Sequence, residues 1–249
     1  MRPCVLVVQN AEWEGPGLIG LHARSAGVGL AKAELFRHGE VIPLARLEAG
    51  AFCAVVALGS PSTAYLPETN PNHSQLVRLF RAVREHGIPS FNVCYSMQLF
   101  SIVHGGSVVR NPLGKEVGLA DVSPTRAGGA DPVIGGLGRF TTLQWHGDVV
   151  DRLPEGALHL AYSKKTKHQV AVLDGIHYLV QADGQAATPA MVGSWIRHDS
   201  AWATRGTGVV ASSLLLEVTR RQAYLRNTFL RMFANFLGLA LSGGGLAGR

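Results

Sequence analysis

A cysteine stands between a short apolar run and the start of a predicted helix in the stretch FNVCYSMQLF, residues 91–100. A thiol gains from that position alone, because a helix N-terminus stabilises a thiolate and its backbone N–H groups can hold a developing oxyanion. Cys94 is therefore a candidate nucleophile. Ends of parallel strands are also ordinary places for a buried structural thiol, and this alternative stays open.

The other two cysteines, Cys4 and Cys53, lie inside apolar runs, where a free thiol usually packs as a small hydrophobic group. The three cysteines form no CxxC pair, and no Cys/His spacing is typical of zinc. We therefore expect neither a disulfide framework nor a metal site. The sequence also has no phosphate loop and no dinucleotide fingerprint, so we expect no bound cofactor.

Three short apolar runs, at 4–10, 51–60 and 88–93, end in polar or glycine residues, which is typical of strands buried on both faces of a parallel sheet. Apolar positions at helical spacing predict a helix over 73–87, between the second and third strands. This strand, helix, strand unit should be a right-handed crossover. A second helix should follow Cys94 and end at Gly105 and Gly106.

The region 107–182 changes character, because short alternating stretches are divided there by Gly, Asp and Pro. We expect small antiparallel strands and hairpins in it. Apolar positions at helical spacing over 219–241 predict a C-terminal amphipathic helix that packs against the sheet.

The composition of the 249 residues fits a globular α/β protein: 47% are hydrophobic, only 16% are charged, and there are 30 glycines for tight turns. We predict one domain over residues 1–240 and a flexible C-terminal tail over 241–249, which contains the sequence SGGGLAGR at 242–249. The N-terminal apolar run is too short for a signal peptide, and the 13-residue stretch FLRMFANFLGLAL contains Arg231 and Asn235. We expect no membrane span and a cytoplasmic protein.

The net charge of +6 is spread along the chain, and the only dense basic cluster is KKTKH at 164–168. This distribution disfavours a nucleic-acid partner. The lysines of this loop could attract an anionic substrate or an acidic partner protein, or the loop could be a solvated hairpin tip.

Five motifs follow one another along the chain: LGSPS (58–62), IPSFNVCYSMQLF (88–100), KEVG (115–118), QWHGD (144–148) and YLVQ (178–181). Their order resembles the class I glutamine amidotransferase family, and in particular its stand-alone members similar to the amidotransferase domain of GMP synthase. The resemblance runs from residue 4 to about residue 238. It implies a flavodoxin-like α/β fold with a central, mostly parallel sheet, flanking helices and a small antiparallel sheet.

The resemblance also assigns roles to individual residues. Cys94 occupies the nucleophile position, and Gln98 matches a glutamine that lines the family's substrate site. Gly59 and Ser60 match the loop whose backbone N–H faces the oxyanion, and Tyr95 would offer a second N–H.

Two parts of the sequence depart from the family pattern. Asn92 and Ser96 replace the two glycines of the nucleophile turn. After YLVQ the family continues with Phe-His-Pro-Glu, whereas this chain has Asp183 at the His position and Gln185 at the Glu position. The base and its carboxylate partner are thus both absent, and Asp183 should raise the pKa of a nearby thiol. His146 is the best-placed substitute base, with a structural histidine as the alternative.

The sequence therefore predicts a divergent cysteine-dependent amide hydrolase, or an acyl or amido transferase, in small-molecule metabolism. Its substrate would be a small amide or a glutamyl-like compound. Two alternatives remain: a catalytically inactive binding or scaffold homologue with a protein partner, and an ordinary glutaminase subunit that supplies ammonia to a synthetase.

Overall fold

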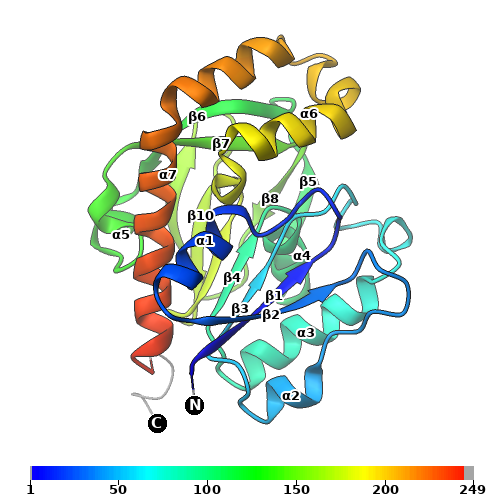
Figure 1. Cartoon of the computed structure of the whole chain (residues 1–249), viewed down its shortest axis with the longest axis vertical. Helices are drawn as coiled ribbons and strands as arrows, with labels where there is room; N and C mark the ends of the chain where they lie inside the picture. Colours follow the sequence, from blue (N-terminus) through cyan, green and yellow to red (C-terminus); the bar gives the residue numbers. More distant parts are fainter. Residues whose placement is uncertain (1, 244–249) are drawn as a thin grey trace.

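The computed structural model describes residues 2–243, and its centre is a nine-stranded sheet in the order β2-β1-β3-β4-β11-β10-β9-β6-β7 (Figure 1). The first five strands in this order run parallel to one another. These are β2 (Gly29–Glu34), β1 (Cys4–Gln9), β3 (Ala54–Ala57), β4 (Ser90–Val93) and β11 (His177–Val180).

The remaining strands of this sheet pair antiparallel. They are β10 (Val170–Leu173), β9 (Leu158–Ser163), β6 (Glu116–Pro124) and β7 (Phe140–His146). A separate antiparallel pair joins β5 (Ser107–Arg110) to β8 (Asp148–Arg152). The predicted mostly parallel sheet and small antiparallel sheet are both present.

Helices cover both faces of the parallel part of the sheet (Figure 1). On one face lie α1 (Gly17–Ser25) and the C-terminal half of α7 (Ala211–Leu241), and on the other lie α2 (Leu44–Glu48), α3 (His73–Glu85) and α4 (Tyr95–Val103). The short α5 (Arg126–Ala130) packs on β9. Three single 3₁₀ turns complete the fold: η1 (Pro67–Thr69), η2 (Gly135–Leu137) and η3 (Gly184–Ala186).

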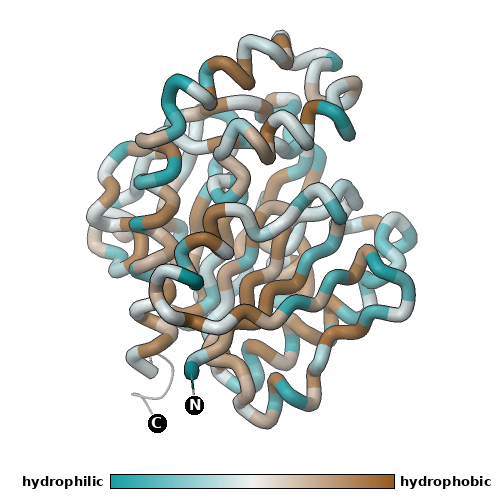
Figure 2. The backbone as a smooth tube through the Cα atoms, in the orientation of Figure 1, coloured by the Kyte–Doolittle hydropathy of each residue, from teal (hydrophilic) through white to brown (hydrophobic). Residues whose placement is uncertain are grey.

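Strand β1 shows why its sequence is a continuous apolar run. Val5 and Val7 belong to the core on the α1 and α7 face, while Leu6 and Val8 belong to the core on the α3 and α4 face. Successive side chains of a strand point to opposite faces, so a strand covered on both sides needs apolar residues throughout. Figure 2 shows the same pattern as brown segments concentrated on the central strands.

A third apolar cluster lies at one end of the sheet, beneath α6 (Pro189–Thr204) and the N-terminal part of α7. Trp195 from α6, Leu214 and Val218 from α7, and Leu143 from β7 are buried in it. In Figure 1 these two helical segments cross the upper end of the molecule. We call them the roof, because they lie over the cavity described below.

The predicted strands at 4–10 and 88–93 and the predicted helix at 73–87 are present with slightly shorter bounds, whereas the run at 51–60 contains only the four-residue strand Ala54–Ala57. The C-terminal helix is longer than predicted: it begins at Ala211 and ends at Leu241, one residue beyond the predicted domain boundary at 240. Most of the predicted tail, 244–249, lies outside the described residues, so that boundary stays a prediction. In residues 2–243, no helix combines the length and apolarity needed to cross a membrane.

Candidate active site

Cys94 occupies the turn between β4 and α4 with φ +50° and ψ −112°. Its N–H donates to Val180 O at 2.8 Å, which anchors the turn to β11. In the described part of the chain the only other non-glycine residue with positive φ is Asp174. Such backbone conformations cost roughly 1–3 kcal/mol and cluster at functional sites. A residue that serves only as core packing has no need of this strain, so the geometry favours the nucleophile interpretation.

Asn92 and Ser96, which the resemblance predicts at the positions of two family glycines, both make hydrogen bonds at this turn. Asn92 is fully buried, and its Nδ2 donates to Ser90 Oγ at 2.9 Å and to Tyr178 O at 3.2 Å. Ser96 Oγ donates to Leu58 O at 2.6 Å. The hydroxyl thus ties the first turn of α4 to the loop that follows β3.

That loop contains Gly59 and Ser60, and it lies against the cysteine. A Cβ atom added at Gly59 would lie 3.6 Å from Cys94 Cβ and would clash with the carboxylate of Glu14. Asn10 Nδ2 holds the loop by donating to Leu58 O at 2.8 Å and to Gly59 O at 3.1 Å. The absence of a side chain at Gly59 therefore leaves room both for the thiol and for Glu14.

Two glutamines surround the sulfur on its other side. Gln181 Nε2 donates to Cys94 Sγ at 3.6 Å, and Gln98 Nε2 donates to Gln181 Oε1 at 3.3 Å. Gln98 is itself held by Asp148 O at 2.9 Å. The backbone N–H of Tyr95 also faces the sulfur, while its phenol accepts from Asn70 Nδ2 at 3.0 Å.

Asp183, which the sequence resemblance predicts at the position of the family histidine, lies beside the thiol. Its side chain is almost completely buried, Oδ1 accepts from Gln185 Nε2 at 3.4 Å, and Oδ2 has no hydrogen-bond partner. Burial raises the pKa of Asp183 to about 7, although the Gln185 amide and the Cys94 thiol offset part of the effect. Near pH 7 the Asp183 carboxyl group is therefore protonated in about half of the molecules.

The thiol is in a negatively charged environment. Burial raises the pKa of Cys94 well above its ordinary value, and the carboxylates of Asp183 and Glu14 raise it further. This agrees with the effect that the sequence predicted for Asp183. Near neutral pH the group is a thiol, so any reaction at Cys94 needs an acceptor for its proton.

His146 lines the same cavity as Cys94, but one nitrogen of its ring contacts two other buried side chains. Its Nε2 lies 3.1 Å from Gln144 Oε1 and 3.4 Å from Glu116 Oε2, and its Nδ1 is buried without a partner. Glu116 is a buried centre that also accepts hydrogen bonds from the Ser163 and Thr166 hydroxyls, each at 2.7 Å. Within residues 2–243, the side chain that donates to Cys94 Sγ is Gln181 and not a histidine.

The cavity above Cys94 has a volume of about 310 Å³. Its walls bring together predicted residues (Ser60, Cys94, Tyr95, Gln98, His146 and Asp183) with others that the sequence analysis missed (Trp13, Glu14, Arg110, Lys115, Asp199 and Trp202). Gly59 precedes the lining residue Ser60, and Gln185 does not line the cavity but contacts Asp183. Trp13 and Glu14 follow the carboxyl end of β1, where ligands of open parallel sheets bind, so this topological rule could have found them.

The KKTKH loop lies elsewhere. Lys164, Lys165 and Lys167 line a separate cavity of about 290 Å³ beside β5 and β8, and none of them lines the cavity of Cys94. Lys165 Nζ donates to Lys115 O at 2.9 Å. The loop is therefore not part of the cysteine site.

Comparisons with known proteins identify the family to which this part of the chain is similar. Residues 56–176, which include the loop at Gly59 and the turn at Cys94, match the family model "Glutamine amidotransferase class-I". The chain carries a class I glutamine amidotransferase domain. The family model ends before Asp183 and Gln185, so the predicted replacement of the family histidine and glutamate at these positions stays a prediction.

Two curated relatives of this amidotransferase domain differ in what their names say they do. The chain is 30% identical over 172 residues to the glutamine-hydrolysing GMP synthase of Nitratiruptor, covering 68% of this chain but 30% of that protein. It is 28% identical over 153 residues to a γ-glutamyl-L-1-hydroxyisopropylamide hydrolase from a Pseudomonas species, covering 57% of this chain and 51% of that protein. The chain thus spans about half of one relative's length and less than a third of the other's.

Solved structures of glutamine amidotransferases share the fold over nearly the whole chain. The protein from Thermotoga maritima superimposes with a TM-score of 0.83 at 22% identity, covering 95% of this chain and 99% of that one. The protein from Methylobacillus flagellatus gives 0.84 at 22% identity, covering 96% and 95%. The predicted α/β fold of this family is confirmed.

Proposed function

We propose that this protein is a cysteine-dependent amide hydrolase, or an acyl or amido transferase, that acts on a small γ-glutamyl-like amide. Cys94 is the nucleophile, and Asp183 accepts its proton in place of the family histidine. The observation that carries the proposal is the strained backbone of Cys94, which presents the thiol to a cavity of about 310 Å³ next to a buried carboxyl group.

In the first step the sulfur of Cys94 bonds to the amide carbon while Asp183 takes the thiol proton. The carbonyl oxygen becomes an oxyanion, which the backbone N–H groups of Ser60 and Tyr95 would stabilise. As the carbon–nitrogen bond breaks, protonated Asp183 gives the proton to the leaving nitrogen. Water, or an acceptor nucleophile in a transferase, then loses a proton to Asp183 and attacks the thioester carbon. As the carbon–sulfur bond breaks, Asp183 returns that proton to the sulfur of Cys94.

A carboxyl group with a pKa of about 7 is suited to this exchange, because it both accepts and returns a proton near neutral pH. A positioned base of this kind contributes roughly 10²- to 10⁴-fold in rate. One feature of the site opposes this mechanism. The carboxylate of Glu14 lies against the loop at Gly59, and if it were ionised, with no cation beside it, it would repel the oxyanion.

His146 remains the alternative base. Its place in the cavity wall supports that role, but its hydrogen bond with Gln144 and its ion-pair contact with Glu116 support a structural one. We therefore propose Asp183 rather than His146 as the group that moves the proton.

The experiment is intact-protein mass spectrometry after incubation with a glutamine-shaped chloroketone. The wild type should gain one adduct at Cys94, Cys94→Ala should gain none, and Asp183→Asn should react at least about tenfold more slowly if Asp183 is the base. His146→Asn is the matched test of the alternative base. Hydrolysis of a panel of γ-glutamyl amides by the same variants then identifies the reaction.

A second candidate, a binding homologue without catalysis, is favoured by the raised pKa of Cys94 and the absence of a cationic partner for the thiol among residues 2–243. Labelling of Asp183→His/Gln185→Glu but not of the wild type would support it and refute our proposal. Hydrolysis of glutamine itself by the wild type, at a rate above that of other amides, would instead support an ordinary glutaminase.

A further inference from the structure

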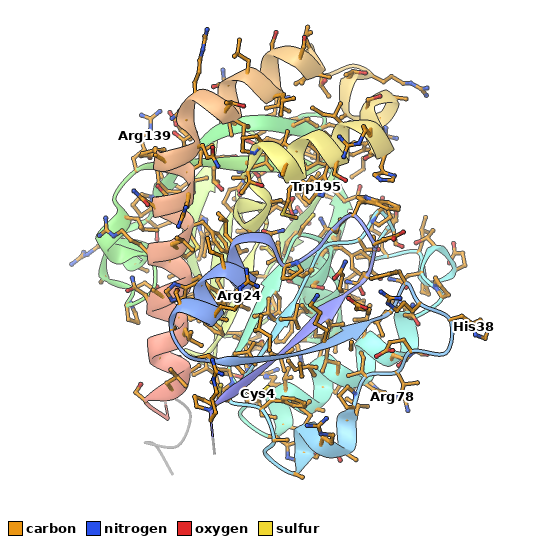
Figure 3. The ribbon with its side chains drawn as sticks, in the orientation of Figure 1. Cys4, Arg24, His38, Arg78, Arg139 and Trp195 are labelled. Carbon is orange, nitrogen blue, oxygen red and sulfur yellow. The ribbon has the colours of Figure 1, made fainter. Side chains whose placement is uncertain are left out.

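The basic loop at 164–168 borders a cavity that the proposed reaction does not use. This second cavity has a volume of about 290 Å³ and lies between the two-stranded sheet β5–β8 and the hairpin that joins β9 to β10. Among residues 2–243, none that lines it also lines the Cys94 cavity. All four tryptophans of the chain, including Trp195, which Figure 3 labels on α6, line the Cys94 cavity instead. The second cavity is therefore a separate place for a ligand.

One wall of the second cavity is apolar. Val109 of β5 and Val149 of β8 are directly opposite each other in the strand register, so their side chains lie on the same face of the pair. Pro112 and Leu113 continue this wall beyond the end of β5. Leu113 is 61% exposed and Val109 is 38% exposed. An occupant with an apolar part would remove this surface from water, which is favourable.

Another wall of the second cavity is basic. It is lined by Lys164, Lys165 and Lys167, which are three of the five lysines in the chain. Other basic side chains are dispersed over the molecule, as Figure 3 shows for three arginines: Arg24, Arg78 and Arg139. The lysines therefore form a local concentration of positive charge.

This positive charge is only partly balanced at the cavity. One carboxylate, that of Asp151, also lines it. None of the ion pairs within residues 2–243 involves Lys164, Lys165 or Lys167. Lys165 Nζ donates to a neutral acceptor, Lys115 O, at 2.9 Å. In the part of the chain that the structure describes, the cavity wall thus has three ammonium groups and one carboxylate, which favours an anionic occupant.

The hairpin that carries the lysines is held in place by the protein itself. Glu116, which does not line the cavity, accepts hydrogen bonds from Ser163 Oγ and Thr166 Oγ1, each at 2.7 Å. Ser163 N donates to Thr166 O at 2.8 Å. Asn111 Nδ2 joins the hairpin to the segment after β5 by donating to Lys165 O at 3.2 Å. The backbone around the cavity therefore needs no reordering when a ligand binds.

We propose that the second cavity binds a small anion with an apolar part. A carboxylate or phosphate group of this ligand lies against the three lysines, and its apolar part contacts Val109 and Leu113. A volume of about 290 Å³ is close to the lower limit of ordinary ligand pockets, so the ligand is a small molecule. The site is outside the Cys94 cavity, and this inference does not rest on the function proposed above.

The test is an NMR titration of isotope-labelled wild-type protein at pH 7 and low salt. Hexanoate and hexyl phosphate are the probes, and they distinguish a carboxylate site from a phosphate site. At least one should bind with a dissociation constant of about 1 mM or below and shift backbone amide signals within residues 109–113 and 163–167. Hexan-1-ol lacks the charge, while acetate and inorganic phosphate lack the apolar part. Each of these controls should bind at least about tenfold more weakly.

Two sets of variants separate the basic wall from the apolar wall. Lys164→Gln/Lys167→Gln should weaken binding of the preferred probe at least about fivefold, because it removes two of the three ammonium groups. Leu113→Asn should weaken it about threefold, because it removes apolar contact. The matched control Lys32→Gln removes an exposed ammonium group of β2 and should leave binding unchanged.

A further control locates the probe, because Arg110 and Lys115 line the Cys94 cavity and could attract an anion there. Arg110→Gln should change the affinity less than the double lysine variant does. The inference would be overturned by no binding of either probe at about 10 mM, by equal binding of hexan-1-ol, by unchanged affinity in the double lysine variant, or by a loss confined to Arg110→Gln. Probe binding without chloroketone labelling of wild-type Cys94 would leave the inference standing and refute the proposed function.

Discussion

The pair formed by Cys94 and Asp183 differs from a thiol–imidazole pair in its charge. A histidine can become a cation that stabilises a thiolate, whereas a carboxylate can only accept the proton and then become neutral. When the thiol–carboxyl pair shares one proton, it therefore carries one negative charge whichever group holds that proton, and it becomes neutral when Asp183, with its pKa of about 7, is protonated as well. The pair has no positive charge of its own to offset an oxyanion when one forms.

Ionised Asp183 should also weaken the fold. Its folded-state pKa of about 7 lies above the ordinary value of 3.8, so the folded state holds the proton more tightly than the unfolded state. Stability should therefore fall as pH rises from about 4 to about 7 and then level off, with a total loss of about 4 kcal/mol.

The variant Asp183→Asn lacks this titration. Urea unfolding should show it to be more stable than the wild type at pH 8, by up to about 4 kcal/mol, with the difference shrinking towards zero at pH 4. A stability difference that is the same at both pH values would contradict this account.

At the scale of elements, the start of α1 is fitted closely to η3, the turn that follows Asp183. Gly17 has φ +46°, and a Cβ atom there would overlap Gln185 O and lie 2.5 Å from Met191 Sδ. Gly17→Ala should cost about 2–4 kcal/mol of unfolding free energy, because backbone strain and a clash with another backbone add together.

Gly27 offers the matched control. It has φ +73°, but a Cβ atom there would meet nothing within 4 Å. Gly27→Ala should therefore lose only the strain cost of about 1–2 kcal/mol. Equal losses in the two variants, measured by urea unfolding, would show that the contact between α1 and η3 is loose.

Which elements the sequence predicts depends on how they are buried. Strands β1, β3 and β4 are covered on both faces, so their apolar runs are unbroken and were predicted. Strand β2 lies at the edge of the sheet, contains Lys32 and is only partly buried, so its pattern gave no clear signal. Helix α6 has non-helical backbone at Asp199, which interrupts its periodicity.

The residues of the site also differ in whether the sequence could predict them. Cys94, Gly59 and Asp183 could be located because motifs of a known family surround them in the sequence. Glu14 and Asp199 could not, because they are 185 residues apart and only the packing of α6 over the strand ends brings both to one cavity. Convergence of this kind depends on tertiary structure and leaves no local pattern.

On the scale of the whole molecule, α7 connects the main core to the roof. Its C-terminal half carries Phe229, Phe233 and Phe236, which pack around Phe91 of β4, only three residues before Cys94. Its N-terminal half contributes Leu214 and other residues to the roof. The helix therefore fixes the roof to the same strand that presents the nucleophile.

Phe233 is fully buried at the centre of this aromatic cluster. Phe233→Ala should lower the unfolding free energy by about 3–5 kcal/mol, since it removes a large ring and leaves a cavity. Leu216→Ala, on the same helix but 49% exposed, should change it by less than about 0.5 kcal/mol. Similar losses in both variants would mean that α7 is not anchored by its aromatic face.

The gathering of all four tryptophans around one cavity has an optical consequence. The emission of the folded protein excited at the red edge of indole absorption comes from the walls of this cavity alone. Intensity and wavelength therefore report what occupies the cavity, without an attached dye. Events elsewhere on the surface, such as contacts made by the lysines at 164–167, should leave that signal unchanged.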